Sequence, residues 1–242
     1  GDILTDLDLS KVIETHRENG ADATLSLATV QDPSAYGLVD VAEDGRISRF
    51  IEKPKPEEAE SIGINTINAG IYILEPKILE LIPKGEHRSF EFDVFPEILR
   101  REMAFFGYRM DGCYWRDLGN PRSYLEAHHD FIEGKIGGFD IERSEPRDVA
   151  TAASVDDVSV IGAGAVIKPG AKITKSAIGA GVYIDEKAVV EGSVIWAHAR
   201  ISAGAEIRDA IIGRSGYIGR NVNVGAGTVL GDKASVPDYS KI

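Results

Sequence analysis

Residues 178–195 read IGAGVYIDEKAVVEGSVI, and the pattern of this stretch continues from Val155 to Val236. Isoleucine or valine returns after six, six and then five residues, so each set of three anchors repeats after 17 residues. The anchors are Ile161, Ile167, Ile173, Ile178, Ile184, Val190, Ile195, Ile201, Ile207, Ile212, Ile218 and Val224. A hexapeptide array of this kind is typical of a parallel β-helix, in which three short strands form one triangular coil.

A second set of positions follows the same period. The fourth residue after most anchors is small or β-branched, as at Ala165, Ala171, Val182, Ala188, Ala199, Ala205, Gly216, Val222 and Thr228. We therefore expect at least four stacked coils between about residues 155 and 236, with the anchors inside and each coil stabilised by its neighbours. Any chemistry is then expected mainly in residues 1–135.

Composition limits the possible partners. The chain has 242 residues and a formal net charge of -12 at pH 7, which disfavours nucleic acid and anionic membranes as partners. No apolar run approaches the ~18 residues of a membrane span, and we expect no secretory leader. Cys113 is the only cysteine and cannot form an internal disulfide, which favours a cytoplasmic protein.

Residues 1–135 alternate between strand and helix patterns, which predicts an α/β domain with a mostly parallel sheet. Strands are expected at 23–30, 67–74, 104–110 and 114–118, with a hairpin around Asp44-Gly45. Helices are expected at 9–19, 76–82, 93–102 and 121–133.

Several local signals sharpen this prediction. Asp8 and Asn120 precede helical patterns and are expected as N-caps. The run 67–74 is nearly all apolar and predicts a buried central strand. Residues 136–154 are rich in glycine, proline and charge, so they are expected to link the α/β domain to a β-helix that occupies residues 155–242.

Three charged residues lie at or near expected strand ends: Asp2, Lys53 and Asp117. In open α/β sheets, ligands bind outside the carboxyl ends of strands. Two carboxylates there could hold Mg²⁺ through oxygen ligands, and a lysine could pair with a phosphate. Each of these residues taken alone is more often a turn or surface residue. Asn68 is harder to explain in that way, because an amide inside an apolar strand needs hydrogen-bond partners.

Together these segments resemble the sugar-1-phosphate nucleotidyltransferases. The motifs that carry the resemblance follow in order: Gly1-Asp2, YGLV (36–39), FIEKPK (50–55), INAGIYIL (67–74), SFEFDVFP (89–96) and YWRDLGNP (114–121). The C-terminal array is similar to the extension found on mannose-1-phosphate guanylyltransferases. The resemblance covers essentially the whole chain and implies a partial Rossmann-like α/β nucleotidyltransferase domain followed by a left-handed parallel β-helix.

The resemblance also implies roles for single residues. By matching motif positions, Asp2 and Asp117 would be the two Mg²⁺ ligands, and Lys53 would bind the sugar phosphate. Binding of the sugar would fall to Glu52 through its hydroxyls, to Asn68 at the ring, and to the Gly37 backbone at a further hydroxyl. The implied enzyme transfers a nucleoside monophosphate from a nucleoside triphosphate (NTP) to a sugar 1-phosphate, with mannose 1-phosphate and GTP favoured as substrates.

Two departures from the family pattern bear on this reading. Asn120 stands where the family usually has threonine, and the family's glycine-rich nucleotide loop is absent from residues 1–135. Two to three βα units, roughly 60–100 residues at about 30 per unit, are therefore expected to be missing. We expect the 242 residues alone to be inactive.

Two other functions stay open at this point. A regulatory or structural subunit would keep the fold without the chemistry, although Asp2, Lys53 and Asp117 argue mildly against it. A hexapeptide acyltransferase normally adds a catalytic histidine and an inserted loop, whereas the repeat holds only His198.

A homo-oligomer through the β-helix is also expected, because flat solenoid flanks and terminal coils need covering. Tyr183, Trp196 and Tyr217 are the expected contact residues.

Overall fold

The computed structural model describes residues 1–55, 57, 62–139 and 148–242. The chain divides into two compact units: Gly1 with Ile3–Trp115, and Asp2 with Arg116–Ile242. Residues 140–147 of the expected linker lie outside the described residues. Among the helices of the described residues, none combines the length and apolar character that a membrane span requires.

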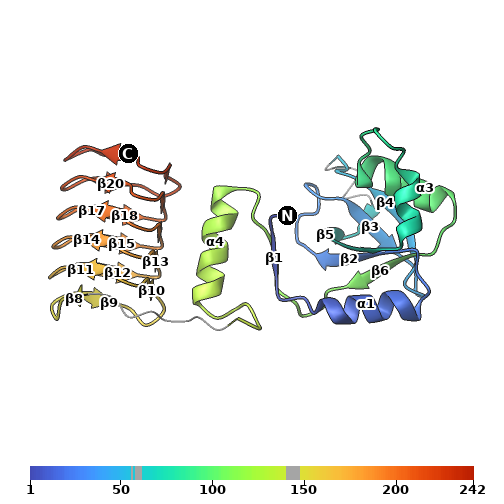
Figure 1. Cartoon of the computed structure of the whole chain (residues 1–242), viewed down its shortest axis with the longest axis horizontal. Helices are drawn as coiled ribbons and strands as arrows, with labels where there is room; N and C mark the ends of the chain where they lie inside the picture. Colours follow the sequence, from blue (N-terminus) through green and yellow to red (C-terminus); the bar gives the residue numbers. More distant parts are fainter. Residues whose placement is uncertain (56, 58–61, 140–147) are drawn as a thin grey trace. The chain divides into compact units, whose positions relative to one another are not determined.

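The first unit combines short helices with a five-stranded sheet, and its first short strand lies outside that sheet (Figure 1). Its elements, in chain order, are β1 (Ile3–Thr5), α1 (Leu9–Glu18), β2 (Ala23–Thr29), β3 (Leu38–Val41), β4 (Ile47–Ile51), β5 (Thr66–Leu74), the 3₁₀-helix η1 (Pro76–Leu81), the π-helical turn η2 (Phe90–Val94), α3 (Phe95–Arg100) and β6 (Phe105–Arg109). The short strand β7 (Trp115–Asp117) begins at the end of this unit.

The sheet of the first unit is mixed, in the order β4-β3-β5-β2-β6. Strands β2 and β6 are parallel, whereas β3 pairs antiparallel with β4 and β5, and β5 pairs antiparallel with β2. The prediction of a mostly parallel sheet is therefore wrong. The expected hairpin at Asp44-Gly45 is confirmed, and a hairpin reverses the chain between adjacent strands, so it produces an antiparallel pair.

Helix α1 forms where the sequence predicts it. Asp8 is its N-cap, and the Asp8 carboxylate accepts a hydrogen bond of 2.9 Å from the Ser10 N–H. This bond satisfies one of the donors that a helix start leaves open. Gly20 follows the helix with φ of 55°, a left-handed conformation that glycine adopts without steric cost.

Strand β5 is central, as predicted, but it is only partly buried. Ile67 and Ala69 are buried, while Gly70 is exposed and the residues after it are half-buried. Its side chains alternate between two hydrophobic clusters, one on each face of the sheet. Phe95 and Ile98 of α3 complete the larger cluster. The apolar run therefore reflects contacts on both faces, although burial is complete only near the start of the strand.

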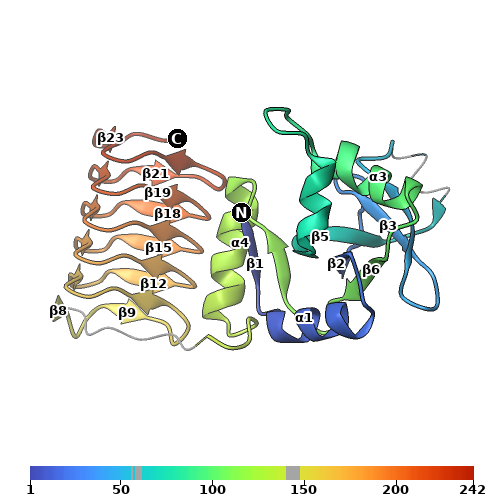
Figure 2. The same ribbon diagram turned by 45° about the vertical axis from the view of Figure 1, so that its right-hand side comes forward.

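The second unit contains α4 (Pro121–Ile132) and the short strands of a parallel β-helix. These strands are β8 (Asp148–Val149), β9 (Ser154–Val155), β10 (Val160–Ile161), β11 (Val166–Ile167), β12 (Lys172–Thr174), β13 (Ala177–Ile178), β14 (Tyr183–Ile184), β15 (Val189–Glu191), β16 (Val194–Ile195), β17 (Arg200–Ile201), β18 (Glu206–Arg208), β19 (Ile211–Ile212), β20 (Tyr217–Ile218), β21 (Asn223–Val224), β22 (Val229–Leu230) and β23 (Ser235–Val236). They stack into about five turns (Figures 1 and 2).

The β-helix confirms the repeat seen in the sequence. Three parallel sheets form its sides, and paired residues such as Ile167, Ile184 and Ile201 differ by the 17-residue period. All the anchors are buried except Ile161, which is half-buried and packs against the same cluster. Coil pairing already includes β8, so the stack begins before residue 155, where the repeat first becomes regular in the sequence.

Helix α4 begins as predicted. The Asn120 side chain accepts a hydrogen bond of 2.9 Å from the Ser123 N–H, and Pro121 occupies the first turn. The helix lies alongside the coils in both views of the second unit (Figures 1 and 2). On the same unit, the His129 ring donates a hydrogen bond of 2.9 Å to the Gly192 carbonyl, so α4 is attached to the solenoid by a specific contact.

Candidate functional site

The two carboxylates expected to hold a metal converge in the second unit. The Leu118 N–H donates to the Asp2 carbonyl at 2.7 Å, which holds the chain segments of Asp2 and Asp117 side by side. A Cβ built on Gly119 would lie 3.0 Å from Asp117 Oδ1 and 3.7 Å from Asp2 Oδ2. Residues separated by most of the first unit in sequence thus direct their carboxylates to one point.

This pair suits a magnesium ion. Its donors are carboxylate oxygens, and Mg²⁺ commonly binds through one or two carboxylates while water and substrate phosphates supply the remaining ligands. No group of three or more histidine, cysteine or acidic side chains gathers anywhere in the described residues. The Asp2–Asp117 pair is therefore compatible with a metal shared with a phosphorylated substrate, and not with a closed structural metal site.

The turn that follows Asp117 is tightly held. The Gly119 N–H donates to Asp117 Oδ1 at 2.7 Å, and Ser123 Oγ donates to the Asp117 carbonyl. The first bond engages only one carboxylate oxygen of Asp117, which is Oδ1. Gly119 itself is exposed, but a side chain there would crowd both carboxylates.

Gly37, Glu52, Lys53 and Asn68 belong to the first unit. The Gly37 carbonyl accepts a hydrogen bond of 2.8 Å from the Asn68 N–H, and the Lys53 N–H bonds the neighbouring Tyr36 carbonyl at 3.2 Å. A Cβ on Gly37 would lie 2.5 Å from Glu52 Oε2 and 2.8 Å from the Phe50 ring, so Glu52 can occupy its position only beside glycine.

The Asn68 amide has a fixed orientation. Its Oδ1 accepts from the Gly70 N–H at 3.0 Å, and its Nδ2 donates to the Tyr72 hydroxyl at 2.8 Å. Tyr72 in turn lies 3.4 Å from Glu91 Oε1, and the other Glu91 oxygen accepts from Ser89 at 2.7 Å. This chain of hydrogen bonds satisfies the half-buried amide and leaves one Nδ2 proton for a ligand.

The surroundings of this cluster shift the pKa values of two side chains, Glu52 and Tyr72. Burial, followed by the charge of Glu91, raises the pKa of Glu52, while Lys53 opposes that shift. Burial is also the main cause that raises the pKa of Tyr72 to about 12, although its bond from Asn68 acts in the other direction. Tyr72 therefore stays a neutral hydroxyl at any ordinary pH. Clustering of polar groups with shifted pKa values is a mark of a functional site.

Sequence reasoning did not assign Tyr72 or Glu91 to the site. Glu91 lies within the SFEFDVFP motif, and Tyr72 is four residues after Asn68 on the same strand face. That spacing is the feature of the sequence that could have placed Tyr72 beside Asn68. Their partners come from β5 and η2, and only the fold shows that these elements meet.

The residues fall into two groups in different units. Asp2 and Asp117 lie together in the second unit, and Gly37, Glu52 and Asn68 lie together in the first, where Lys53 follows Glu52.

Two family models match the chain. The model described as nucleotidyl transferase matches residues 1–134, and the model described as the EIF2B subunit epsilon LbH domain matches residues 141–242. The nucleotidyl transferase match covers the residues that carry both groups of the candidate site. The LbH match covers the β-helix.

Curated relatives agree with this assignment. Mannose-1-phosphate guanylyltransferase of Mycobacterium tuberculosis is 33% identical over 199 residues, which are 79% of this chain and 54% of the relative. UTP–glucose-1-phosphate uridylyltransferase of Synechocystis is 36% identical over 204 residues, covering 79% and 52%. A probable mannose-1-phosphate guanylyltransferase of Arabidopsis thaliana is 28% identical over 260 residues, covering 99% and 68%.

The chain spans about half the length of the first two relatives. The resemblance to sugar-1-phosphate nucleotidyltransferases is confirmed across both units, because the two models together account for nearly all residues. Since the first model alone matches more than half of the sequence, the chain belongs to the nucleotidyl transferase family.

Proposed function

We propose that this protein acts in the transfer of a nucleoside monophosphate from an NTP to a sugar 1-phosphate, with release of pyrophosphate. GTP and mannose 1-phosphate are the proposed substrates, because two of the compared relatives are named mannose-1-phosphate guanylyltransferases. The observation that carries the proposal is the convergence of the Asp2 and Asp117 carboxylates beside Gly119.

The proposed roles follow from the chemistry of each side chain. Asp2 and Asp117 would hold Mg²⁺, which when bound neutralises charge on the reacting phosphates. Lys53 would pair with the phosphate of the sugar, and Glu52 would accept hydrogen bonds from sugar hydroxyls. The Asn68 Nδ2 proton that remains after its bond to Tyr72 would donate to the sugar ring.

The reaction needs no protein nucleophile. An oxygen of the sugar phosphate would attack the α-phosphorus in line, forming one P–O bond while the bond from the α-phosphorus to the bridging oxygen of pyrophosphate breaks. Catalysis of this kind depends on positioning and on charge neutralisation. On this proposal, the described side chains would supply groups for the sugar phosphate and for a metal.

The test is pyrophosphate release from GTP, ATP and UTP with mannose 1-phosphate or glucose 1-phosphate and Mg²⁺. We expect turnover by the product of the whole gene and none by the 242 residues alone, since residues 1–135 hold no glycine-rich phosphate loop. In the active protein, Asp117→Asn should abolish turnover while the melting temperature stays close to that of the wild type.

The same assay separates this function from the alternatives. Binding of mannose 1-phosphate without turnover by either protein would favour a regulatory or structural subunit. Acyl transfer is disfavoured because the coil pairing between residues 148 and 236 keeps a spacing of 17 residues, or of 18 at the first coil (β8–β11 and β9–β12) and at the last (β19–β22 and β20–β23), without an inserted loop. His198 is exposed at a coil corner with φ of 61°.

Association and location are part of the proposal. We infer a cytoplasmic homo-oligomer that assembles through the β-helix, on the basis of the lone Cys113 and the exposed Trp196 and Tyr217. Trp196 also forms a hydrogen bond with Tyr124 of α4, so part of this aromatic surface contacts its own chain. Sedimentation that shows only monomer at micromolar concentration would reject the oligomer.

A further inference from the structure

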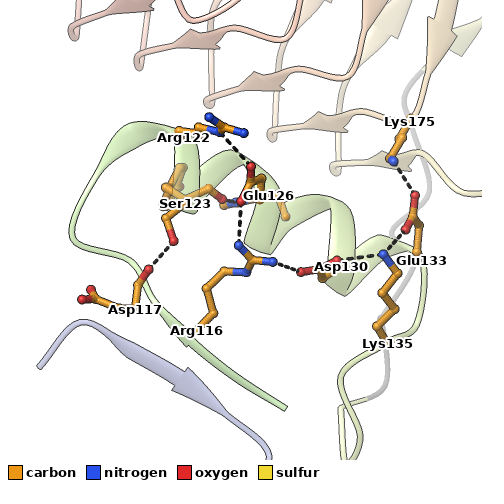
Figure 3. Close-up of polar contacts among 11 residues, drawn as sticks. Arg116, Asp117, Arg122, Ser123, Glu126, Asp130, Glu133, Lys135 and Lys175 are labelled. Atoms are coloured by element: carbon orange, nitrogen blue, oxygen red, sulfur yellow. Dashed lines mark hydrogen bonds and ion pairs between the residues drawn. The ribbon is translucent and has the colours of Figure 1, made fainter. Parts of the chain in front are cut away.

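Helix α4 makes specific contacts in two directions, to Asp117 and to the β-helix (Figure 3). We propose that α4 positions the metal-binding carboxylates, with Ser123 and Arg116 as positioning residues, and that the β-helix in turn sets the place of α4. This inference rests on the proposed role of Asp2 and Asp117. On this proposal, the β-helix supports the geometry of the metal site in addition to providing a surface for assembly.

The contact nearest to the carboxylates comes from Ser123. Its Oγ donates to the Asp117 carbonyl, while its N–H is bound to the Asn120 cap at 2.9 Å. Between these residues, the Gly119 N–H holds Asp117 Oδ1 at 2.7 Å. The first turn of α4 and the loop before it therefore form one hydrogen-bonded unit, and a shift of α4 would move the Asp117 carboxylate.

Arg116, which directly precedes Asp117, is bound to the middle of α4. Its guanidinium reaches Glu126 and Asp130, each at 2.7 Å, and these carboxylates lie one helical turn apart (Figure 3). A planar fork of donors suits two acceptors at this spacing. The Asp130 side chain is only 11% exposed and that of Arg116 28%, so water screens this pair less than an ordinary surface ion pair.

The other side of α4 is attached to one corner of the β-helix. Glu133 accepts from Lys175 at 2.6 Å and from Lys135 at 2.8 Å, and the His129 ring donates to the Gly192 carbonyl. Lys175 and Gly192 differ by 17 residues and so occupy the same corner in successive coils. A Cβ on Gly192 would already lie 3.7 Å from the His129 ring, which shows how closely α4 approaches.

That corner is itself rigid. The Lys175 N–H donates to Asp156 at 2.7 Å, and the Ser176 N–H bonds Ser159 one coil earlier at 3.0 Å. Buried serines at this column continue the pattern, since Ser176 Oγ accepts from the Ser193 N–H at 3.1 Å. A ladder of this kind gives α4 a fixed support, because each coil is held by its neighbour.

The predicted consequence is a change in metal affinity. Groups that orient metal ligands commonly alter affinity by about 10–100-fold when they are removed. We expect Ser123→Ala to weaken Mn²⁺ binding to the 242-residue chain by roughly tenfold, measured from free Mn²⁺ in electron paramagnetic resonance titrations. Ser123→Thr keeps the hydroxyl and should restore most of the affinity, while Asp117→Asn should abolish it.

The contact between α4 and the β-helix can be tested with a variant and a matched control. Lys175→Gln removes the ion pair with Glu133 and should weaken Mn²⁺ binding by a few-fold. Arg208→Gln removes exposed ion pairs with Glu206, 2.8 Å away, and with Glu191, 3.5 Å away, on the same solenoid, and should leave Mn²⁺ binding unchanged. Equal behaviour of the two variants would overturn the part of the proposal that concerns the β-helix.

A readout without metal separates this inference from the proposed function. Amide hydrogen exchange at Leu118 and Gly119 reports directly on the bonds to Asp2 and Asp117. Ser123→Ala should speed exchange at both amides, and Ser123→Thr should reverse the change, with thermal melts close to the wild type. Unchanged exchange would overturn the inference. A wild-type chain that binds no Mn²⁺ would reject the metal role, while the exchange data still decide on positioning.

Discussion

Among single residues, Glu52 is expected to make the stability of the folded chain depend on pH. Burial and Glu91 raise its pKa above the ordinary 4.5, so the folded chain holds this proton more strongly than the unfolded chain. Its contribution to stability is therefore complete below pH 4.5 and is lost as the pH rises through the folded-state pKa. We expect Glu52→Gln to raise the melting temperature by about 1–2 °C at pH 7.

This gain should fade as the pH falls below 4.5, because wild-type Glu52 is then protonated and resembles glutamine. Thermal melts of both proteins across this range provide the measurement. A gain of the same size at acid pH would mean that the cost of Glu52 is not electrostatic. If Glu52 binds sugar hydroxyls, the same variant should bind mannose 1-phosphate more weakly despite its higher stability.

Tyr72 tests the orientation of the Asn68 amide. Tyr72→Phe removes the hydroxyl that accepts from Asn68 and lies beside Glu91, so a half-buried amide loses a partner. We expect a loss of about 1–2 kcal/mol in the free energy of unfolding, and weaker binding of mannose 1-phosphate by calorimetry. Tyr217→Phe, at an exposed tyrosine of the β-helix, is the control. Equal sugar affinity in Tyr72→Phe would show that Asn68 needs no such support.

Among the secondary-structure elements, α4 depends most on a buried charge. Asp130 is 8% exposed and accepts from Arg116 at 2.7 Å and from Lys135 at 2.9 Å. Asp130→Ala leaves two cations without this partner, and we expect a loss of about 2–4 kcal/mol in urea unfolding. Arg100→Gln in α3 breaks an exposed ion pair and should change the midpoint little. Comparable losses in the two variants would mean that the contacts of Asp130 stabilise the fold no more than an exposed ion pair does.

The elements also show what the sequence could and could not predict. Helices α1 and α4 were predictable because Asp8 and Asn120 cap them locally, and β3–β4 because Asp44-Gly45 encodes its own turn. The direction of the other strand pairs depends on contacts between distant segments, so strand-helix alternation led to a wrong prediction of a mostly parallel sheet. The π-helical turn at 90–94 is held by side-chain bonds of Ser89, which no hydrophobic period records.

The candidate site also contains residues that the sequence could predict and residues that it could not. Asp2 and Asp117 could be proposed because each lies at a strand end in a recognisable motif, although their convergence needed the fold. Tyr72 and Glu91 were missed, since their importance comes from a bond between β5 and η2. Sequence motifs identify residues that touch ligands more readily than residues that orient them, because an orienting residue is defined by its partner.

Across the whole molecule, the second unit is a stack in which every coil depends on the next. Ile184 is fully buried, and β14 pairs with both β11 and β17. Ile184→Asp places an unpaired charge in this core, a cost too large for neighbouring coils to offset. We expect the β-helix to unfold at ordinary temperature, whereas Ile184→Val, the conservative control, should lose about 1 kcal/mol.

The two compact units make the effect of Ile184→Asp informative beyond stability. Because α4 is attached to the coils through Lys175 and Gly192, loss of the β-helix should also release α4 and the turn at Asp117. The sheet of the first unit has its own clusters around Phe95 and should keep its structure. Amide exchange would then show fast exchange at Leu118 and Gly119 and continued protection in β2 and β5. Protection retained at Gly119 in a chain whose coils have unfolded would mean that the carboxylate pair forms without the solenoid.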